Sequence, residues 1–250
     1  MTELDFFQQR ILNSGVFTGT VLIQAHGEIG GSRNVFVKLQ SSAKNGLVYP
    51  SIGGVLVNPF KGNAKIFAGD LLEFNPGIEG DTGATVKIMK TYEAAKAATG
   101  ATEILIKRDG FRHIPFVGDI IMVAPNKIDG TGTGVTVTAV EETTDNTAGD
   151  VWKLTVSAAL TVTLGGVLVE ATAATATAKA VVTNPNCYAP SDYDFVYNPA
   201  AAIDKFEGAR YLFTPCLANG STVLYKNKMS PMPASVFAMN TSKVAGWFSL

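Results

Sequence analysis

The chain has 250 residues, which gives room for one large domain or, more commonly at this length, two smaller ones. Its 20 basic and 21 acidic residues leave a formal net charge of -1, which excludes the generally basic surface that binds nucleic acid or an anionic membrane. Charged residues are only 16% of the chain, while hydrophobic residues are 46%. A surface so poor in charge indicates a protein that is covered by other protein, further copies of itself included.

The N-terminal sequence has acidic residues before its first arginine and lacks a long apolar core, so it does not read as a secretory signal. No later stretch offers the roughly 18 apolar residues of a membrane span. We therefore expect synthesis in a cytoplasm.

Residues 1–45 are expected to form an N-terminal arm and a hairpin. The arm starts with a short helix over residues 4–12, which carries Phe6 and Phe7 and ends before Gly15. Two adjacent phenylalanines near a terminus need an apolar surface to cover, either in this protein or on a partner.

The hairpin is predicted from two strand-like stretches, residues 16–25 and 34–39, on either side of a glycine-rich turn. His26 ends the first strand and has no second histidine, cysteine or paired carboxylate nearby. We interpret it as a turn or surface residue.

One short pattern occurs twice: an aromatic residue, any residue, Gly and Asp, followed by an apolar strand. The first copy ends at Asp70 and the second at Asp119, and the likeness in sequence is confined to these turns. Glycine permits a tight turn, and the aspartate can accept hydrogen bonds from backbone amides where the next strand begins. The pattern is typical of small β-barrels, and neither aspartate has the neighbouring ligands of a metal site. Phosphate-loop patterns are absent from the sequence, so no cofactor is expected.

Residues 91–100 give the clearest helical pattern in the chain. The segment is rich in alanine and ends at Gly100, which predicts a short helix that leans on a sheet as a connector.

Residues 102–173 contain short stretches of alternating apolar and polar residues, separated by turn sequences. This pattern predicts a small antiparallel barrel, because closing a sheet buries one face of every strand and leaves no long free edge. We expect Phe116 and Trp152 in its core. His113 lies in the loop before the second Gly-Asp turn and is expected to have a structural or solvent-facing role.

The barrel ends in a long hairpin. Residues 134–142 are expected to pair with residues 151–157 across a polar tip, residues 143–150. The tip has no aromatic or arginine anchor, so we interpret it as solvent-facing.

Together these elements predict a mainly β protein, in which a small antiparallel β-barrel is inserted in or follows a second β-rich domain with one short helix. The second domain is discontinuous, over residues 46–101 and 174–250. The alanine and threonine run at residues 171–178 has no bulky side chain, which favours a linker or a plain edge strand, and we place the boundary there.

The part after this boundary is rich in Pro, Asn and Tyr and has no metal-binding pattern. Cys187 and Cys216 are too few for a disulfide framework and lack the spacing of a zinc site, so two buried thiols and one bridge both stay open. Three aspartates lack the glycine and the closing glutamate of a calcium-binding loop, namely Asp192, Asp194 and Asp204.

Both ends of the chain carry large apolar residues, although chain ends are normally frayed and polar. The candidate partner contacts are Phe6, Phe7, Trp247, Phe248 and Leu250. Attachment through such groups should depend little on salt. The alternative is that both ends fold back onto the protein's own core.

The segment NPFKGNAKIFAGDLLEFNP, the later segments FVGDIIMV, GVTVTAVEETTD and WKLTVSAAL, and the ending SVFAMNTSKVAGWF resemble virion structural proteins of tailed bacteriophages. The resemblance is to the capsid decoration, auxiliary capsid or head-fibre kind, such as those of crAss-like phages. It implies a non-enzymatic homo-oligomer that binds the major capsid protein on the outer surface of a virion assembled in the cytoplasm of a bacterial host. It supplies no catalytic residues.

Two other classes of function are alternatives to a virion structural protein. An enzyme would need a convergent acid, base or nucleophile, and the sequence offers only His26 and His113, in different regions and without a nucleophile motif. We therefore expect no catalytic residue, and expect alanine at either histidine to leave folding nearly intact. A carbohydrate-binding or adhesive module is the nearer alternative, because tyrosines that fit turns and interfaces can also stack on sugars: Tyr188, Tyr193, Tyr197 and Tyr211.

Overall fold

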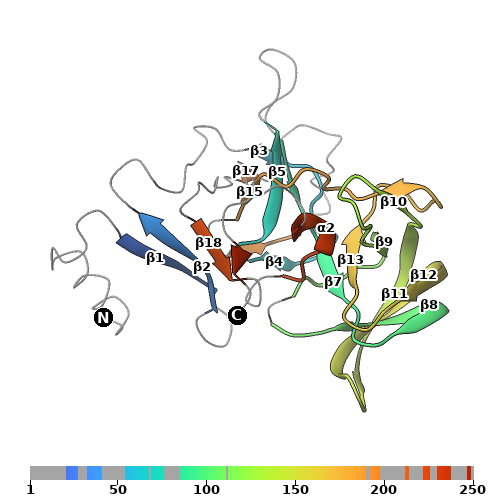
Figure 1. The fold of residues 1–250 in the computed structure, drawn as a ribbon. Coiled ribbons are helices and arrows are strands. Elements are labelled where there is room, and N and C mark those ends of the chain that lie inside the picture. Colours follow the sequence, from blue (N-terminus) through green and yellow to red (C-terminus); the bar gives the residue numbers. More distant parts are fainter. Residues whose placement is uncertain are drawn as a thin grey trace.

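The structure, a computed structural model, is built mainly from β-strands, which confirms the predicted class (Figure 1). It describes residues 21–27, 33–40, 54–67, 69–75, 85–110, 112–189, 192–197, 212–213, 222–225, 230–237 and 247–248. Only the backbone is described for residues 21–27, 33–40, 54–55, 188, 212–213, 222–225, 237 and 247–248. The helix found in this part of the chain is one turn long, α2 (Ala234–Phe237).

A six-stranded sheet holds the middle of the chain and lies to the right in Figure 1. Its strands, in spatial order, are β7 (Thr91–Glu93), β13 (Val167–Glu170), β9 (Ile120–Val123), β11 (Val135–Asp145), β12 (Gly149–Val162) and β8 (Ala98–Lys107). The first and last strands also meet, because Ala94 bridges Ile106 and the Ala95 amide donates to Leu105 O over 2.8 Å.

The remaining strands form smaller sheets. A five-stranded sheet has the order β15 (Cys187–Tyr188), β5 (Leu71–Asn75), β6 (Thr85–Ile88), β3 (Gly54–Leu56) and β17 (Leu212–Phe213). Two ribbons pair β10 (Thr131–Gly132) with β14 (Ala178–Lys179), and β16 (Tyr193–Phe195) with β4 (Ala64–Ile66). A four-stranded sheet, to the left in Figure 1, has the order β1 (Val21–Gly27), β2 (Arg33–Gln40), β18 (Thr222–Tyr225) and β19 (Trp247–Phe248). The predicted hairpin near the N-terminus is confirmed as the antiparallel pair β1 and β2.

Two apolar clusters form most of the described core. One lies within the six-stranded sheet and includes Tyr92, Ala94, Ile104, Ile106, Ile121, Val135, Val137, Leu154, Val156, Leu160, Val162 and Leu168. The other joins the five-stranded sheet to the loop before β4 and includes Leu56, Phe60, Ile66, Leu72, Val86, Ile88, Cys187, Ala189 and Phe195.

The two aromatic residues predicted for the barrel core are placed differently. Trp152 is only partly buried at the side of the first cluster, where Arg108 lies 5.6 Å from its ring centroid. Phe116 packs against the second cluster instead, beside Phe60. The prediction for Phe116 was therefore wrong, because the turn that follows it directs the ring toward the loop before β4.

The helix predicted over residues 91–100 is also wrong. Tyr92 lies opposite Leu168 of β13, and Ala98 lies opposite Val162 of β12, so this segment supplies strands to two neighbours. Tyr92 and Ala94 are buried in the sheet core. Helix propensities differ by less than about 1 kcal/mol per residue, and long-range pairing with burial of large side chains outweighs such preferences.

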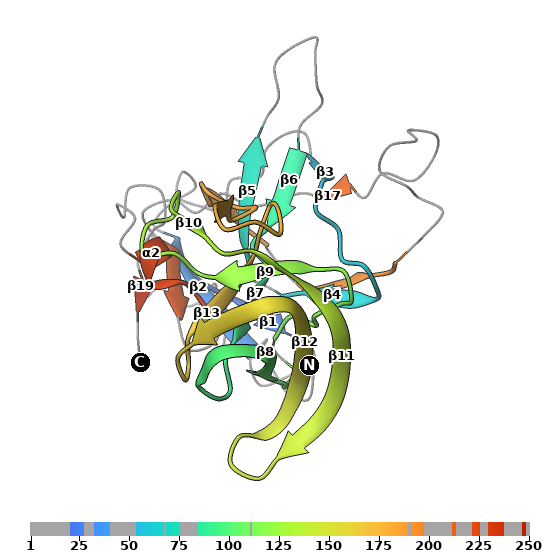
Figure 2. The same ribbon diagram turned by 90° about the vertical axis from the view of Figure 1, so that its right-hand side faces the viewer.

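The predicted long hairpin is confirmed as β11 and β12, which curve away from the body in Figure 2. Its tip is tighter than expected, with Asp145 paired to Gly149. The Asp145 carboxylate accepts the amides of Thr147 and Ala148 at 2.9 and 3.0 Å, and Gly149 has a φ of 74°. This is local turn chemistry of the kind that Asp and Gly favour.

The run at residues 171–178 is packed at its two ends, while residues 174–177 are exposed, and its last residue begins β14. Ala171 bridges Ala180, and both are buried with Ala178 against Met122. A Cβ atom at Gly134 would lie 2.0 Å from Ala173 O. The absence of a side chain at Gly134 therefore allows the close approach of the two chain segments.

Candidate functional site

The two Gly-Asp turns have the same local structure. In the first, the Phe67 amide donates to Asp70 Oδ2 over 2.7 Å and the Asp70 amide donates to Phe67 O over 2.9 Å. In the second, Phe116 and Asp119 make the same two bonds at 2.9 and 3.0 Å. The glycines have φ angles of 84° and 86°, in the left-handed region. The roles predicted for Gly and Asp in these turns are confirmed.

The likeness extends to the strand that pairs with each turn. Gly69 donates to Ala189 O and Ala189 donates back to Asp70 O, at 2.8 and 2.9 Å. At the second turn, Val137 makes the bonds that Ala189 makes at the first. The Gly118 amide donates to Val137 O and the Val137 amide donates to Asp119 O, both over 2.8 Å.

The strands that pair with the other sides of β5 and β9 also match each other. Beside β5, Leu72 lies opposite Ile88, and the next residue, Met89, donates to Leu71 O. Beside β9, Ile121 lies opposite Glu170, and Ala171 donates to Ile120 O. The chain therefore contains two copies of one three-stranded unit, although the sequence likeness covers only the turns.

The first aspartate is buried and holds two distant segments. Asp70 Oδ2 accepts from His113 Nε2 at 2.9 Å, and Asp70 Oδ1 accepts from Ser230 Oγ at 2.6 Å. The Thr91 amide donates to His113 Nδ1 over 3.0 Å. Because Nδ1 accepts this bond, the hydrogen-bond network assigns the proton of the neutral ring to Nε2, which donates it to Asp70.

This placement corrects the expectation for His113. Its side chain is fully buried between the rings of Phe60 and Phe67, whose centroids lie 5.8 and 6.1 Å from its own. A buried ring with both nitrogens bonded cannot be truncated without loss of packing and of two hydrogen bonds. The structural role is supported, but the expected tolerance of His113→Ala is withdrawn.

The three side chains cannot act as a nucleophilic triad in this arrangement. The carboxylate of Asp70 lies between the Ser230 hydroxyl and the His113 ring, so the ring does not contact the hydroxyl that it would have to deprotonate. The network instead fastens the segment before α2 and the loop before the second turn to the first turn.

The second aspartate has different partners. Asp119 Oδ2 is 3.3 Å from the Tyr92 hydroxyl, and Asp119 Oδ1 is 3.7 Å from Lys61 Nζ. Lys61 also donates to Gly118 O. Burial, and after it the negative charge of Asp119, raises the pKa of Tyr92 well above its ordinary value.

A buried ion pair joins the two units. Lys90 Nζ is 3.1 Å from Glu170 Oε1 and 2.9 Å from Pro59 O, and lies 5.0 Å from the Phe60 ring centroid. Asn58 Nδ2 donates to the other Glu170 oxygen over 2.7 Å. Every polar atom of this pair thus has a partner, as buried charges require.

Within the described ranges, no three His, Cys, Asp or Glu side chains gather as metal ligands would. No helix in those ranges has the length and apolar character needed to cross a membrane.

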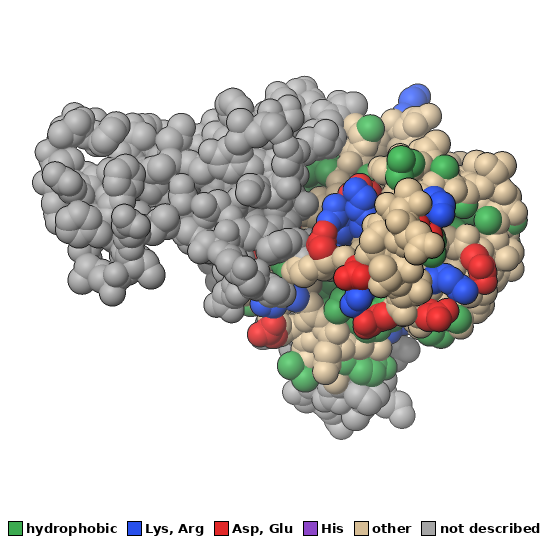
Figure 3. Space-filling view, turned by 90° about the horizontal axis from the view of Figure 1, so that it is seen from below, with side chains coloured by type: hydrophobic (Ala, Val, Ile, Leu, Met, Phe, Trp, Pro, Cys, Tyr) green, Lys and Arg blue, Asp and Glu red, His purple; other side chains and the backbone are tan. Residues whose placement is uncertain are grey.

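The surface around the β11 and β12 hairpin is covered by ion pairs between neighbouring strands. Lys153 lies 3.5 Å from Glu103 and 3.6 Å from Glu141, while Arg108 lies 2.9 Å from Glu142. Lys96 and Asp145 meet at 3.1 Å across an open groove of about 400 Å³. Figure 3 shows acidic and basic side chains interspersed on this face. The charges therefore largely neutralise one another.

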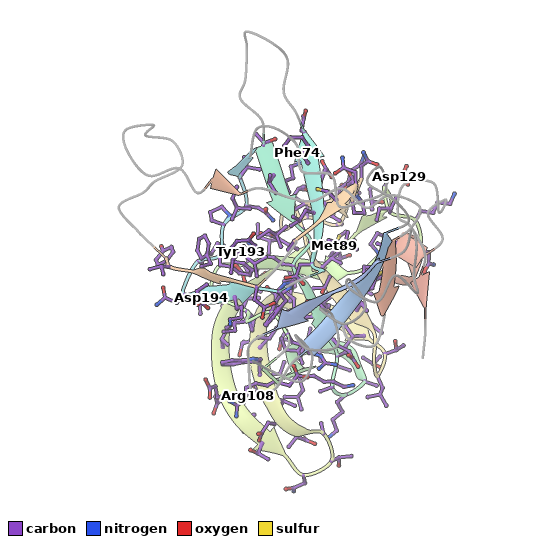
Figure 4. All side chains as sticks on the ribbon, turned by 90° about the vertical axis from the view of Figure 1, so that its left-hand side faces the viewer. Phe74, Met89, Arg108, Asp129, Tyr193 and Asp194 are labelled. Atoms are coloured by element: carbon purple, nitrogen blue, oxygen red, sulfur yellow. The ribbon has the colours of Figure 1, made fainter. Side chains whose placement is uncertain are left out.

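Large exposed apolar side chains of the described part lie on other segments. Four of the five large ones in the described part lie on or beside two segments that meet the loop at residues 61–63, namely Val117, Tyr193, Val196 and Tyr197. The Tyr197 amide donates to Asn63 Oδ1 over 2.8 Å, and Lys61 bonds to Gly118 O beside Val117. We call these four residues the apolar patch. Figure 4 shows Tyr193 and Asp194 at the side of the molecule, on the strand next to β4. The fifth residue, Leu164, lies on the turn between β12 and β13.

The partner contacts predicted at the chain ends are only partly within the described residues. Phe6, Phe7 and Leu250 lie outside them. Trp247 and Phe248 form β19, parallel to Leu224 and Tyr225 of β18, and only their backbone is described. The contacts of their side chains therefore stay a prediction.

Several other predicted candidates can be placed. His26 lies in β1, with only its backbone described. Cys187 is buried, with its Sγ atom 3.5 Å from Leu72 O, while Cys216, Asp204 and Tyr211 lie outside the described residues. Asp194 is exposed and lies 3.6 Å from Lys65.

Comparisons with protein-family models, with curated protein sequences and with solved structures found no match for this chain. The function is therefore inferred from the residues and their contacts.

Sequence reasoning missed Thr91, Tyr92, Lys90 and Ser230 as members of the buried networks. Ser230 is 160 positions from Asp70, and His113 is 43 positions from it. No local pattern marks such partners. The only available signal was the repeated turn, which places a buried carboxylate at two positions.

Proposed function

We propose that this chain is a non-enzymatic virion structural protein that attaches to the outer surface of a phage capsid, in contact with the major capsid protein and with further copies of itself. The observation that carries the proposal is the separation of the apolar patch from a hairpin face whose charges pair with one another. The resemblance in sequence supports the same class. The buried polar networks are consistent with it, because they join distant segments of the chain.

The surface chemistry favours attachment through apolar contact. Val117 is 58% exposed and Tyr197 is 43% exposed, on a chain with a net charge of -1. Apolar side chains at the centre of an interface supply most binding energy, while paired surface charges contribute little. Affinity for the capsid should therefore fall only weakly as salt is raised.

Particles stripped of this protein provide the test. Added protein should sediment with them at both low and high salt. Val117→Asp and Tyr197→Asp should each weaken binding about tenfold or more, because each places a charge in the contact. Leu164→Asp is the matched control, since Leu164 is 69% exposed and lies outside the patch. Failure of the unchanged protein to bind particles would refute the function, whereas equal binding by all three variants would refute only the patch.

The chain ends stay candidates for the same contact. Removal of residues 246–250 takes away β19. A normally melting protein that no longer joins the particle would support docking, whereas a large fall in melting temperature would show that these residues stabilise the protein's own sheet.

We also propose that the six-stranded sheet closes into the small barrel expected from the sequence. Support comes from the bridge between Ala94 and Ile106 and from the bond between Ala95 and Leu105, which link the two outer strands. In a closed barrel the Ala95 amide should exchange with solvent as slowly as amides of the central strands.

A carbohydrate-binding or adhesive module is the second candidate. Tyr193 in β16 and Tyr197, two residues after β16, are both exposed, and their rings could stack on a sugar. A glycan array that gives specific binding, abolished by Tyr197→Ala, would favour this function over capsid attachment.

A further inference from the structure

The long hairpin has one edge whose backbone groups have no strand partner among the described residues. The Arg108 amide donates to Asp150 O over 3.2 Å, so the backbone carbonyl of Asp150 in β12 points toward β8. This bond fixes the direction in which the backbone groups of the neighbouring residues point. Backbone groups alternate along a strand, so the next residue, Val151, points toward β11. Thr143, opposite Val151, therefore bonds to β12, and its neighbours Glu142 and Thr144 point their backbone groups outward.

The first residues of β11 are already paired along this same side of the strand. Val135 and Thr136 of β11 pair with β9, and Val137 exchanges two hydrogen bonds with the second Gly-Asp turn. After a register shift between Val137 and Ala139, no strand in the described part of the chain lies beside β11. Figure 2 shows this side of the curved hairpin standing out from the body. We call Val140, Glu142 and Thr144 the β11 edge.

The charges beside this edge are acidic. Strand β11 carries Glu141, Glu142 and Asp145 and has no lysine or arginine. The cations that pair with these acids come from Lys153 of β12, from Arg108 just after β8 and from Lys96 just before β8. Their charged groups meet the acids at 2.9 to 3.6 Å, but their backbones lie one or more strand spacings of about 5 Å farther from an added strand, so residues of that strand would lie directly opposite the β11 acids. Glu141 is 64% exposed and Glu142 is 58% exposed, so both can meet a partner.

A second copy of this chain is a poor occupant in the registers centred on Glu141, Glu142 and Thr143. Antiparallel pairing of two β11 edges about Glu142 would place Glu142 opposite itself, and pairing about Glu141 would place Glu141 opposite itself. Pairing about Thr143 would place Glu141 opposite Asp145. Like charges directly opposite one another destabilise a strand pair.

We propose that the β11 edge binds an extended segment of another polypeptide by strand addition, and that this segment carries lysine or arginine opposite the β11 acids. Main-chain hydrogen bonds to Val140, Glu142 and Thr144 supply the binding, and the acidic side chains select the partner. This inference goes beyond capsid attachment and does not depend on it, since any basic extended segment satisfies the same chemistry.

The test uses the full-length protein and two synthetic peptides of equal length, one alternating lysine with valine and one alternating glutamate with valine. The lysine peptide, at millimolar concentration, should shift the amide resonances of Val140, Glu142 and Thr144, and the glutamate peptide should not. Absence of any shift with the lysine peptide, or equal shifts with both peptides, would overturn the proposal.

Proline at the edge separates backbone pairing from charge attraction. Glu142→Pro removes one outward amide and none of the bonds to β12, so the protein should keep its melting temperature and lose affinity for the lysine peptide about tenfold or more. Thr144→Pro serves the same purpose if the first variant does not fold. Glu142→Gln keeps the amide and should lose much less affinity. Binding by a folded proline variant at the level of the unchanged protein would show that the edge is not the site.

Discussion

His113 is the residue at which burial and hydrogen bonding combine most closely. Its ring joins Thr91 to Asp70 and fills the space between two phenylalanines. We expect His113→Ala to lower the free energy of unfolding by about 3 kcal/mol, because the change opens a cavity and removes one donor from a buried carboxylate. Ser230→Ala removes a different donor from the same carboxylate and should cost only about 1 to 2 kcal/mol. Urea denaturation of both variants checks this order, and a His113→Ala protein as stable as the original would contradict the buried network.

The second Gly-Asp turn depends on a left-handed glycine. Gly118 has a φ of 86°, where a Cβ atom costs about 1 to 2 kcal/mol. Gly118→Ala should lower the free energy of unfolding by that amount, and Gly118→Asn by less, because Asn tolerates this region better. Thermal melting of the two variants measures the difference. Equal stability of the alanine variant and the original protein would mean that the turn adopts another conformation.

Tyr92 should make the protein sensitive to alkaline pH. Because burial and then Asp119 raise its pKa in the folded state, the neutral hydroxyl is favoured by folding. This contribution to stability is complete below the ordinary tyrosine pKa of about 10 and is lost as the pH rises above it. Denaturant unfolding at increasing alkaline pH should show the loss, and Tyr92→Phe should reduce it. An unchanged pH dependence in Tyr92→Phe would assign the effect to other groups.

At the scale of elements, the two three-stranded units are held together by Lys90 and Glu170. Lys90→Met should lower the free energy of unfolding by about 3 kcal/mol, because it leaves a mostly buried carboxylate without its cation. Adding Glu170→Gln should cost less than the sum of the two single changes, with a coupling of about 1 kcal/mol or more. Chemical denaturation of the four proteins in the cycle provides the measurement.

A matched control for this cycle lies in β6, three residues before Lys90. Lys87 meets Glu73 at 3.3 Å but is 35% exposed. Lys87→Met should therefore change stability by less than about 1 kcal/mol. Similar costs for Lys87→Met and Lys90→Met would show that burial of the pair has no special effect.

At the scale of the whole molecule, the six-stranded sheet sets the boundary of a unit that could fold alone. A fragment of residues 102–173 lacks Tyr92 and Ala94, which are buried in the core, and removes the strand that pairs with β13. We expect a fragment of residues 91–182 to give a dispersed amide spectrum and a sharp melting transition, and the shorter fragment to be markedly less stable. Equal stability of the two fragments would place β7 outside the folding unit.

The sequence alone determined those features that depend on residues within a few positions of one another. The apolar and polar alternation predicted the strands of the long hairpin, and a polar segment between them predicted its tip. The repeated Gly-Asp pattern predicted two turns with a carboxylate bonded to backbone amides. Each of these rests on local geometry, since the atoms that bond are brought together by the turn itself.

Only the tertiary structure decided the features that depend on distant partners. Residues 91–100 have an alanine-rich helical pattern, yet they form strands because β13 and β12 offer them hydrogen bonds and a core to fill. His113 reaches Asp70 across 43 positions and Ser230 reaches it across 160, and no spacing in the sequence indicates either contact. The likeness of the two three-stranded units was hidden for a related reason. The units repeat the same backbone hydrogen bonds, which different side-chain sequences can form equally well.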